Sequence, residues 1–407
     1  MEFIIISLIK AALVAFVLLT LAAYLVWIER KVLAHIQLRI GPYRVGPHGL
    51  LQPLSDLIKL VTKEGVIPSQ VNKFYYLLAP FLAVALALIS ISVVPFGTQI
   101  ELFGYKTYME LANVNMGILV ILAVSAMSVY GVALGGWASN NKYSLLGGLR
   151  SSAQMISYEL PMSLALVSPL LIANTLSLRE IAEMQSGFYW GVIPKWFIFN
   201  WPAPQIFAFI IFMIAAFAET NRIPFDLPEA ENELVAGFHT EYSSTCFAAF
   251  VTAEYVNMVT ISALATHLYL GGWNPAFPEP VASEVPILLF AGAGLLLFFH
   301  GMQTLATRTW DKYTFPVFGV VAFGLAGIFS LKYLTFLPAP LLAIGGALHP
   351  VFWFAAKVGA ILFLYIWVRG TLPRFRFDQL MRFTWTFLFP LAIVQLLATG
   401  LIVALGN

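Results

Sequence analysis

The sequence predicts an all-α polytopic membrane protein with about ten transmembrane helices. Hydrophobic residues make up 60% of the 407 positions and charged residues only 10%, and the mean hydropathy is +0.85. This composition excludes a soluble globular domain. The apolar residues also gather in runs of about 20, the length that carries a helix across the hydrocarbon core. We expect residues 1–407 to form a single integral membrane domain.

Ten apolar segments meet this length criterion, within several residues at each end. They are 3–28, 74–95, 114–137, 156–175, 203–218, 243–270, 285–306, 314–336, 350–369 and 385–405. The segment 203–218 is the shortest of them. The lysines and arginines between the segments alternate in number, because 16 of the 22 follow the odd-numbered spans. The positive-inside rule then places the N-terminus outside and the loops after odd-numbered spans in the cytoplasm.

The first cytoplasmic loop, 29–73, has the pattern of an ordered segment. The pairs Gly41-Pro42 and Gly46-Pro47 are strong turn signals. Beyond them, apolar residues recur at helical spacing opposite polar ones: Leu50, Leu54, Leu57, Ile58 and Val61 against Ser55, Asp56, Lys59 and Lys63. The pattern predicts an amphipathic helix at the membrane surface or against a partner. A simple interfacial anchor explains it equally well.

The most acidic part of the chain is the segment 217–242, which we call the acidic loop. Six of the protein's 20 acidic residues fall within it: Glu219, Asp226, Glu229, Glu231, Glu233 and Glu241. Crowded carboxylates share protons, and the pKa of at least one of them rises towards neutrality. The segment therefore suits a proton relay at the cytoplasmic side. A solvated acidic loop is the plainer interpretation of the same residues.

Three further charged residues fall inside predicted spans. Glu159 lies near the start of the fourth span, and Glu254 lies near the middle of the sixth. A charged acid at the bilayer centre costs about 2.5–3.5 kcal/mol, so such groups are normally protonated, paired or next to water. Lys357 in the ninth span is a candidate counter-charge, although its side chain could instead extend to the membrane surface. We expect these residues to continue a hydrated carboxylate chain into the membrane.

Four motifs resemble one family. They are ERKVLAHIQLRIGPYRVGPHGLLQPLSDLIKL, SLLGGLRSSAQMISYELP, FAETNRIPFDLPEAENELVAGFHTEYSS and IWVRGTLPRFRFDQLM. In this order they are similar to the membrane subunit, called the H subunit in bacteria, that joins the two arms of respiratory NADH–quinone oxidoreductase (complex I). The resemblance implies a core of about eight spans, to which 271–349 adds two apolar segments. We expect this insertion to contact lipid or a neighbouring subunit.

The resemblance also implies roles for individual residues. The proposed proton relay comprises Glu159, Glu219, Asp226, Glu229, Glu231, Glu233, Glu241, Glu254 and Lys357. The residues expected near the quinone are Trp27, Arg30, Arg39, Gly41, Arg222 and Phe225. A quinone needs polar donors near its headgroup, which these arginines provide, although Arg39 could equally bind lipid phosphates or a partner subunit. Quinone is thus expected as substrate.

Other cofactors are expected on other chains. The lone cysteine, Cys246, cannot hold an iron–sulfur cluster, and the six histidines show no metal-ligand spacing. No nucleotide-binding glycine motif is present, and the basic residues do not form a nucleic-acid-binding patch. We therefore expect no flavin, cluster or metal on this chain. The expected partners are cluster-bearing peripheral subunits on the cytoplasmic loops, small and antiporter-like membrane subunits, and the lipid of a bacterial inner membrane.

Two other functions remain open at this point. Membrane-bound hydrogenases and ferredoxin- or F420-linked pumping complexes use a homologous subunit, some of them without quinone. A free-standing secondary transporter would predict internal inverted repeats, which the sequence does not show. The favoured hypothesis is a subunit that forms the quinone cavity and couples quinone reduction to proton translocation.

Overall fold

The computed structural model describes residues 2–102, 105–226, 237–303, 309–334 and 338–406. Within these ranges nine helices are long and apolar enough to cross a membrane, which confirms the predicted fold class. They are α1 (Glu2–Ile36), α3 (Lys73–Ile91), α4 (Gly117–Ala138), α5 (Lys142–Ala173), α9 (Ser244–Tyr269), α10 (Val281–Gln303), α11 (Thr309–Ser330), α12 (Ala339–Thr371) and a last helix. This last helix is continuous through α13 (Phe377–Phe383), the π-helical turn η5 (Thr384–Leu388) and α14 (Phe389–Gly406).

The tenth expected span is the short apolar helix α7 (Ile206–Glu219). The expected surface helix is α2 (Gln52–Thr62), which has no buried residue. The remaining elements are the 3₁₀ turns η1 (Pro47–Gly49), η2 (Phe197–Phe199), η3 (Gly237–His239) and η4 (Leu331–Tyr333), the helix α6 (Leu178–Met184), and two antiparallel hairpins. The hairpins pair β1 (Gln99–Leu102) with β2 (Tyr105–Tyr108) and β3 (Phe188–Tyr189) with β4 (Ile193–Pro194).

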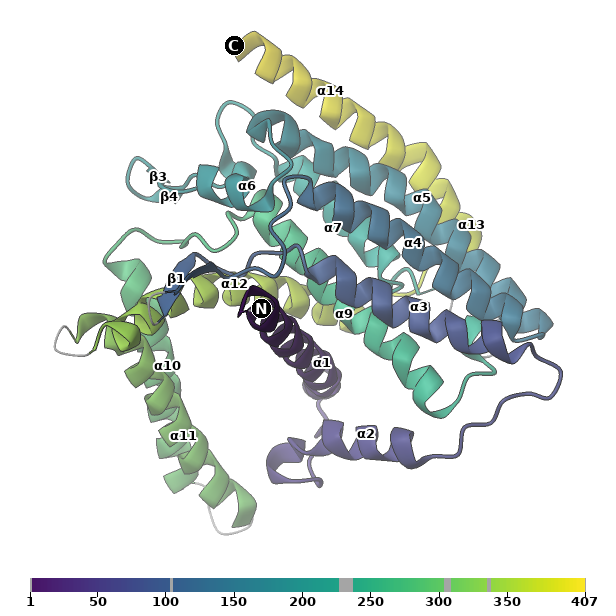
Figure 1. The fold of residues 1–407 in the computed structure, drawn as a ribbon, viewed down its shortest axis with the longest axis horizontal. Helices are drawn as coiled ribbons and strands as arrows, with labels where there is room; N and C mark the ends of the chain where they lie inside the picture. Colours follow the sequence, from purple (N-terminus) through teal and green to yellow (C-terminus); the bar gives the residue numbers. More distant parts are fainter. Residues whose placement is uncertain (1, 103–104, 227–236, 304–308, 335–337, 407) are drawn as a thin grey trace.

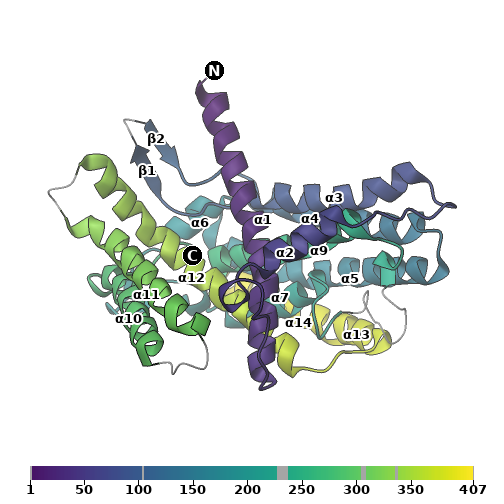
Figure 2. The same ribbon diagram turned by 90° about the horizontal axis from the view of Figure 1, so that it is seen from below.

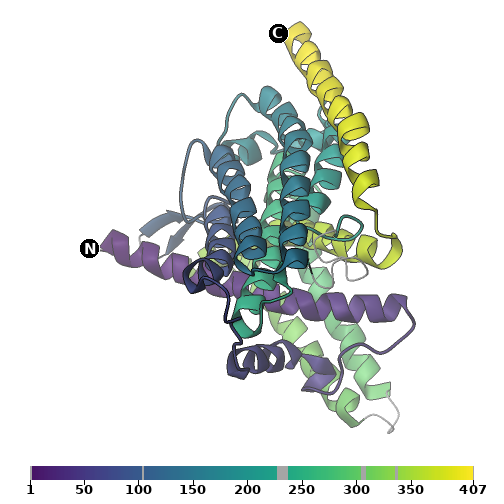
Figure 3. The same ribbon diagram turned by 90° about the vertical axis from the view of Figure 1, so that its right-hand side faces the viewer.

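Helices α3, α4, α5, α7 and α9 form the main bundle, and α14 lies along α5 on its outer side (Figure 1). Helix α9 is central, because it packs against α3, α12, α1 and α7 and is buried along most of its length. Helix α1 crosses beside this bundle (Figure 2), and the two termini project in different directions (Figure 3). Polar side chains on the inward face of α9 are therefore shielded from lipid.

Four helices are longer than the sequence predicts: α1, α5, α12 and the last helix, which begins at Phe377. Helix α1 continues to Ile36, since the residues after the apolar run contain no helix breaker before Gly41-Pro42. Helix α5 begins at Lys142, where the side chain of Asn141 caps it by accepting the Tyr143 N–H at 2.9 Å. Helix α12 begins at Ala339. As a result Glu159 and Lys357 lie near the middle of long helices, and Glu159 is not near a helix start as expected.

A glycine on α5 positions the end of the acidic loop. A Cβ at Gly147 would lie 2.7 Å from the Phe238 backbone nitrogen, so only glycine allows η3 to pack this closely on α5. The Ser144 hydroxyl donates to the Phe238 carbonyl oxygen at 2.7 Å. These contacts hold η3 against the bundle.

The two extra apolar segments form the hairpin α10–α11, which extends away from the main bundle (Figures 1 and 2). Its helices approach closely at Gly294 and Gly319, where a Cβ on either would meet the backbone of the other within 3.1 Å. Near the beginning of α11, Thr314 Oγ1 lies 2.9 Å from His48 Nε2, and Phe315 lies against the His48 ring. The insertion thus contacts the first loop of its own chain, a contact that the sequence did not predict.

Candidate functional site

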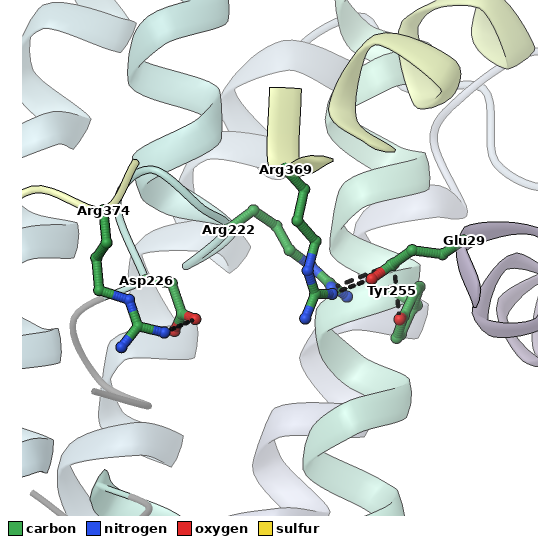
Figure 4. A network of polar contacts seen from close by, with 6 residues as sticks. All are labelled: Glu29, Arg222, Asp226, Tyr255, Arg369 and Arg374. Carbon is green, nitrogen blue, oxygen red and sulfur yellow. Dashed lines mark hydrogen bonds and ion pairs between the residues drawn. The ribbon is translucent and has the colours of Figure 1, made fainter. Parts of the chain in front are cut away.

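The carboxylate of Glu29 is the centre of a buried ion network (Figure 4). It accepts a hydrogen bond from the Tyr255 hydroxyl at 2.9 Å. It also forms ion pairs with Arg222, at 3.5 Å, and with Arg369. The Arg222 guanidinium also lies 4.1 Å from the centre of the Tyr255 ring. The network therefore joins α1, α9, α12 and the acidic loop at one point.

Arg222 remains a cation in this environment. Burial acts to lower its pKa, but Tyr255, Glu29 and Glu254 act in the opposite direction, and the net effect raises the pKa of Arg222 above its usual range. Its Nε and Nη2 atoms are buried and have no hydrogen-bond partner among the described residues. Arg222 thus carries N–H donors beyond those that pair with Glu29.

A second ion pair fixes the start of the acidic loop. Arg374 donates to Asp226 at 2.9 Å, and the Phe375 N–H donates to the Pro224 carbonyl at 3.0 Å (Figure 4). The Phe225 ring is buried between Phe375 and Tyr158, at centroid distances of 5.6 and 5.4 Å. Phe225, expected near the quinone, therefore packs in the protein interior and holds this segment in place.

Glu219, the last residue of α7, lies inside the bundle at 7% exposure. Its Oε1 atom accepts the Ser125 hydroxyl at 3.0 Å, and its Oε2 atom has no hydrogen-bond partner among the described residues. Two cavities of about 30 and 20 Å³ adjoin it, and Glu254 lines the first. The structure thus brings together two of the predicted relay acids, one on α7 and one on α9.

Glu159 and Lys357 differ in their surroundings. Glu159 on α5 is half-buried and close enough to Glu219 for the two charges to repel. The Lys357 ammonium donates to the carbonyl oxygens of Leu270, Gly272 and Asn274 at 2.6, 2.8 and 2.6 Å. Backbone carbonyls therefore surround the Lys357 charge, where the sequence suggested a carboxylate.

The rest of the acidic loop is described only in part. Glu229, Glu231 and Glu233 lie outside the described residues. Glu241 accepts the Asn141 side-chain N–H at 2.6 Å and lines a surface cavity of about 350 Å³. His239 is half-buried, and burial lowers its pKa, although the Asp226 charge acts to raise it.

The residues expected near the quinone in α1 and the first loop lie around the end of α1. Arg30 is exposed and pairs with Asp56 on α2 at 2.9 Å, and Arg39 is exposed and donates to Gln37. A Cβ at Gly41 would lie 3.1 Å from the Arg30 carbonyl, so the loop folds back closely on α1. The Trp27 indole Nε1 is buried and has no hydrogen-bond partner among the described residues.

The described ranges contain no group of three or more His, Cys, Asp or Glu side chains arranged to hold a metal ion. The described part of the site is built from carboxylates, arginines, hydroxyls and amides.

Several residues of the site were not predicted individually. Glu29, Tyr255 and Arg369 make the network, and Ser125 and Asn257 line the cavities with Glu219. Glu29 and Arg369 stand within two of the recognised motifs, but no spacing rule connects positions 340 residues apart. A signal for Asn257 did exist, since an amide three residues after Glu254 lies on the same face of a helix.

Comparisons with known proteins agree with this architecture. The family model for NADH dehydrogenase matches residues 9–400. The NADH-quinone oxidoreductase H subunit of Solibacter usitatus, copy 1, is 62% identical over 404 residues, which cover 99% of this chain and 98% of the relative. The H subunit of Koribacter versatilis, copy 2, is 47% identical (99% and 98% covered), and that of Geobacter metallireducens, copy 1, is 44% identical (98% and 97% covered). The chain therefore belongs to the H-subunit family of NADH-quinone oxidoreductase and is a multi-pass membrane subunit of complex I.

Proposed function

We propose that this subunit forms part of the quinone cavity of a proton-pumping NADH–quinone oxidoreductase and passes protons through its buried carboxylates. It would lie in a bacterial inner membrane with the N-terminus outside and the first and acidic loops in the cytoplasm. Flavin and iron–sulfur clusters would be carried by peripheral subunits that dock on these loops. Small and antiporter-like membrane subunits would continue the relay, so the chain would not be catalytic alone.

The observation that carries this proposal is the position of Glu219. It is a buried carboxylate beside two water-sized cavities, with Glu254 on the first cavity and Glu159 close by. Three acids this close can exchange protons through water, because the loss of a proton from one favours its retention on the others. Asp226, Glu229, Glu231, Glu233 and Glu241 would supply protons from the cytoplasmic side.

The ion network supports the quinone part of the proposal. Arg222 and Trp27 both carry buried N–H groups without partners among the described residues, and a quinone carbonyl is an acceptor for such donors. Arg30, Arg39 and Gly41 would shape the entrance at the end of α1. Phe225 would act indirectly, by holding the segment that carries Arg222.

The coupling between quinone reduction and proton transfer would be electrostatic. A reduced quinone gains negative charge and takes up protons, which changes the proton affinity of the nearest carboxylates. The Arg222 charge interacts with both Glu29 and Glu254, so a change at the quinone would reach Glu254 through it. Moving each charge against 100 mV requires about 2.3 kcal/mol, which sets the scale of the change that the relay must transmit.

The test is two separate neutral substitutions, Glu254→Gln and Glu229→Gln, each made in the whole complex. We expect both variants to assemble and to lose proton uptake by inverted membrane vesicles during NADH oxidation. Glu183→Gln on α6 is the matched control, since Glu183 is exposed and lies outside the site. Proton uptake at the wild-type rate in the Glu254→Gln complex would contradict the relay.

The quinone partner needs a separate test, because hydrogenase-like and ferredoxin- or F420-linked complexes use related subunits. We expect a quinone-site inhibitor to block NADH-driven turnover in isolated membranes. Turnover that continues at saturating inhibitor would favour the alternative function.

A further inference from the structure

The two cavities that Glu219 lines share one further lining residue, Asn257. The first cavity is also lined by Glu254 and Ser128, and the second by Ser90, Ser125 and Thr260. Along α9 the lining positions advance from Glu254 through Asn257 to Thr260, so the second cavity lies one helical turn further from the acidic loop. We call the two the near cavity and the deep cavity.

Both cavities are the right size and polarity for water. A buried site holds a water molecule when it offers at least about 10–15 Å³ and two to four polar partners. The near and deep cavities offer about 30 and 20 Å³, and each is lined by a carboxylate, an amide and at least one hydroxyl. The Oε2 atom of Glu219 has no hydrogen-bond partner in the described part of the chain, and it provides an acceptor that such a water molecule would satisfy.

The hydroxyls of the deep cavity are already used as donors. Ser90 donates to the Leu86 carbonyl, Thr260 donates to the Val256 carbonyl, and Ser125 donates to Glu219. Each hydroxyl has only one proton, so all three present only acceptor lone pairs to the cavity. The amide of Asn257 is the lining side chain that can donate to water here and also accept from it.

We propose that Asn257 is a positioning residue that holds an ordered water molecule against Glu219 and links the near cavity to the deep one. Water held by the Asn257 amide would direct one of its protons towards Glu219 Oε2 and the other towards the hydroxyl oxygen of Ser90 or Thr260. A proton on Glu219 would then pass to this water while the water gives up one of its own protons to a second water molecule in either cavity. This inference rests on the proposed proton relay and adds to it the residue that extends it.

The test replaces Asn257 in the intact complex. Asn257→Leu keeps the branched shape and removes the donor, and we expect proton uptake by inverted vesicles to fall at least about tenfold. Asn257→Gln, which keeps an amide that can both donate and accept, should recover most of it. Thr399→Val on α14 is the control, because Thr399 is a buried polar residue that lies outside both cavities. NADH oxidation by ferricyanide, which does not need quinone, reports assembly of each variant.

Comparison with Glu219→Gln separates this inference from the proposed relay. If Glu219→Gln stops proton uptake and Asn257→Leu pumps normally, the role of Asn257 is wrong and the relay stands. If Glu219→Gln itself pumps normally, the proposed function fails at Glu219. If Asn257→Leu does not assemble, a density map of the wild-type complex decides: water between Asn257 and Glu219 supports the proposal, and an empty deep cavity overturns it.

Discussion

Glu29 and Glu219 are both buried carboxylates, but they differ in the number and charge of their partners. Glu29 is surrounded by two arginines and a tyrosine hydroxyl. Glu219 accepts one hydrogen bond, from the Ser125 hydroxyl, and its second oxygen has no partner among the described residues. Two cations and a hydroxyl hold a carboxylate in one position, whereas a carboxylate with one hydroxyl donor beside small cavities and other acids keeps an oxygen available for another partner. The contacts of the first region fix its geometry, and under the proposed relay the second region exchanges protons.

The largest effect that tests this comparison is expected from Glu29→Gln. The change leaves Arg222 buried without its carboxylate, and breaking a buried pair in this way typically costs about 3–5 kcal/mol. We expect a markedly lower thermal midpoint for the purified complex, or less of this subunit in the membrane. Asp378→Asn breaks the exposed pair with Arg376 and should change the midpoint little. Equal midpoints for the two variants would mean that the Glu29 network contributes no special stability.

An intermediate effect is expected from Arg374→Gln. Asp226 is buried and would lose a charge-assisted hydrogen bond, at a cost of about 1–3 kcal/mol. The acidic loop should then open more readily, and limited proteolysis between 222 and 242 would measure this. A cleavage rate equal to that of the wild type would show that the backbone contact of Phe375 suffices to hold the loop.

A small effect on stability is expected from Glu219→Gln. The amide is nearly isosteric, can still accept from Ser125, and removes a buried charge, so the change should stay within about 1 kcal/mol. Proton uptake should nevertheless stop. A loss of stability as large as that of Glu29→Gln would remove the distinction between the two regions.

The smallest effect is expected from pH. Burial lowers the pKa of His239, so the native protein binds a proton there less readily than the unfolded chain, whose histidine titrates near about pH 6.5. Stability should therefore fall as the pH drops from about 7.5 to about 5.5. His239→Phe should reduce this fall, measured as the difference in thermal midpoint between the two pH values. If His239→Phe leaves the pH dependence of the thermal midpoint unchanged, other titratable groups cause that dependence.

The sequence predicts the membrane helices well because hydrophobic length alone determines them. Each of the ten apolar runs corresponds to a helix, and the helical spacing of Leu50 to Val61 corresponds to α2. The boundaries of α5 and α12 were less predictable, because Lys142 and Ala339 start helices whose first residues are too polar or too rich in glycine and proline for a hydropathy criterion.

The site was predictable as a set of acids but not as a geometry. Glu219 was expected because it belongs to the crowded acids of the acidic loop, and Glu254 because charge is costly in a membrane. Their environments depend on residues such as Ser125, which neither composition nor spacing distinguishes from ordinary helix residues. Lys357 shows the limit most clearly, since its partners are backbone carbonyls and a sequence does not display the direction of its own carbonyls.

The contact between Thr314 and His48 constrains the length of the α10–α11 hairpin. Each residue inserted into or deleted from α11 ahead of Thr314 would turn that side chain by about 100° and shift it by about 1.5 Å. Apolar substitutions along the lipid-facing sides should therefore be well tolerated, whereas a single-residue insertion would separate the hairpin from the turn at Pro47–Gly49.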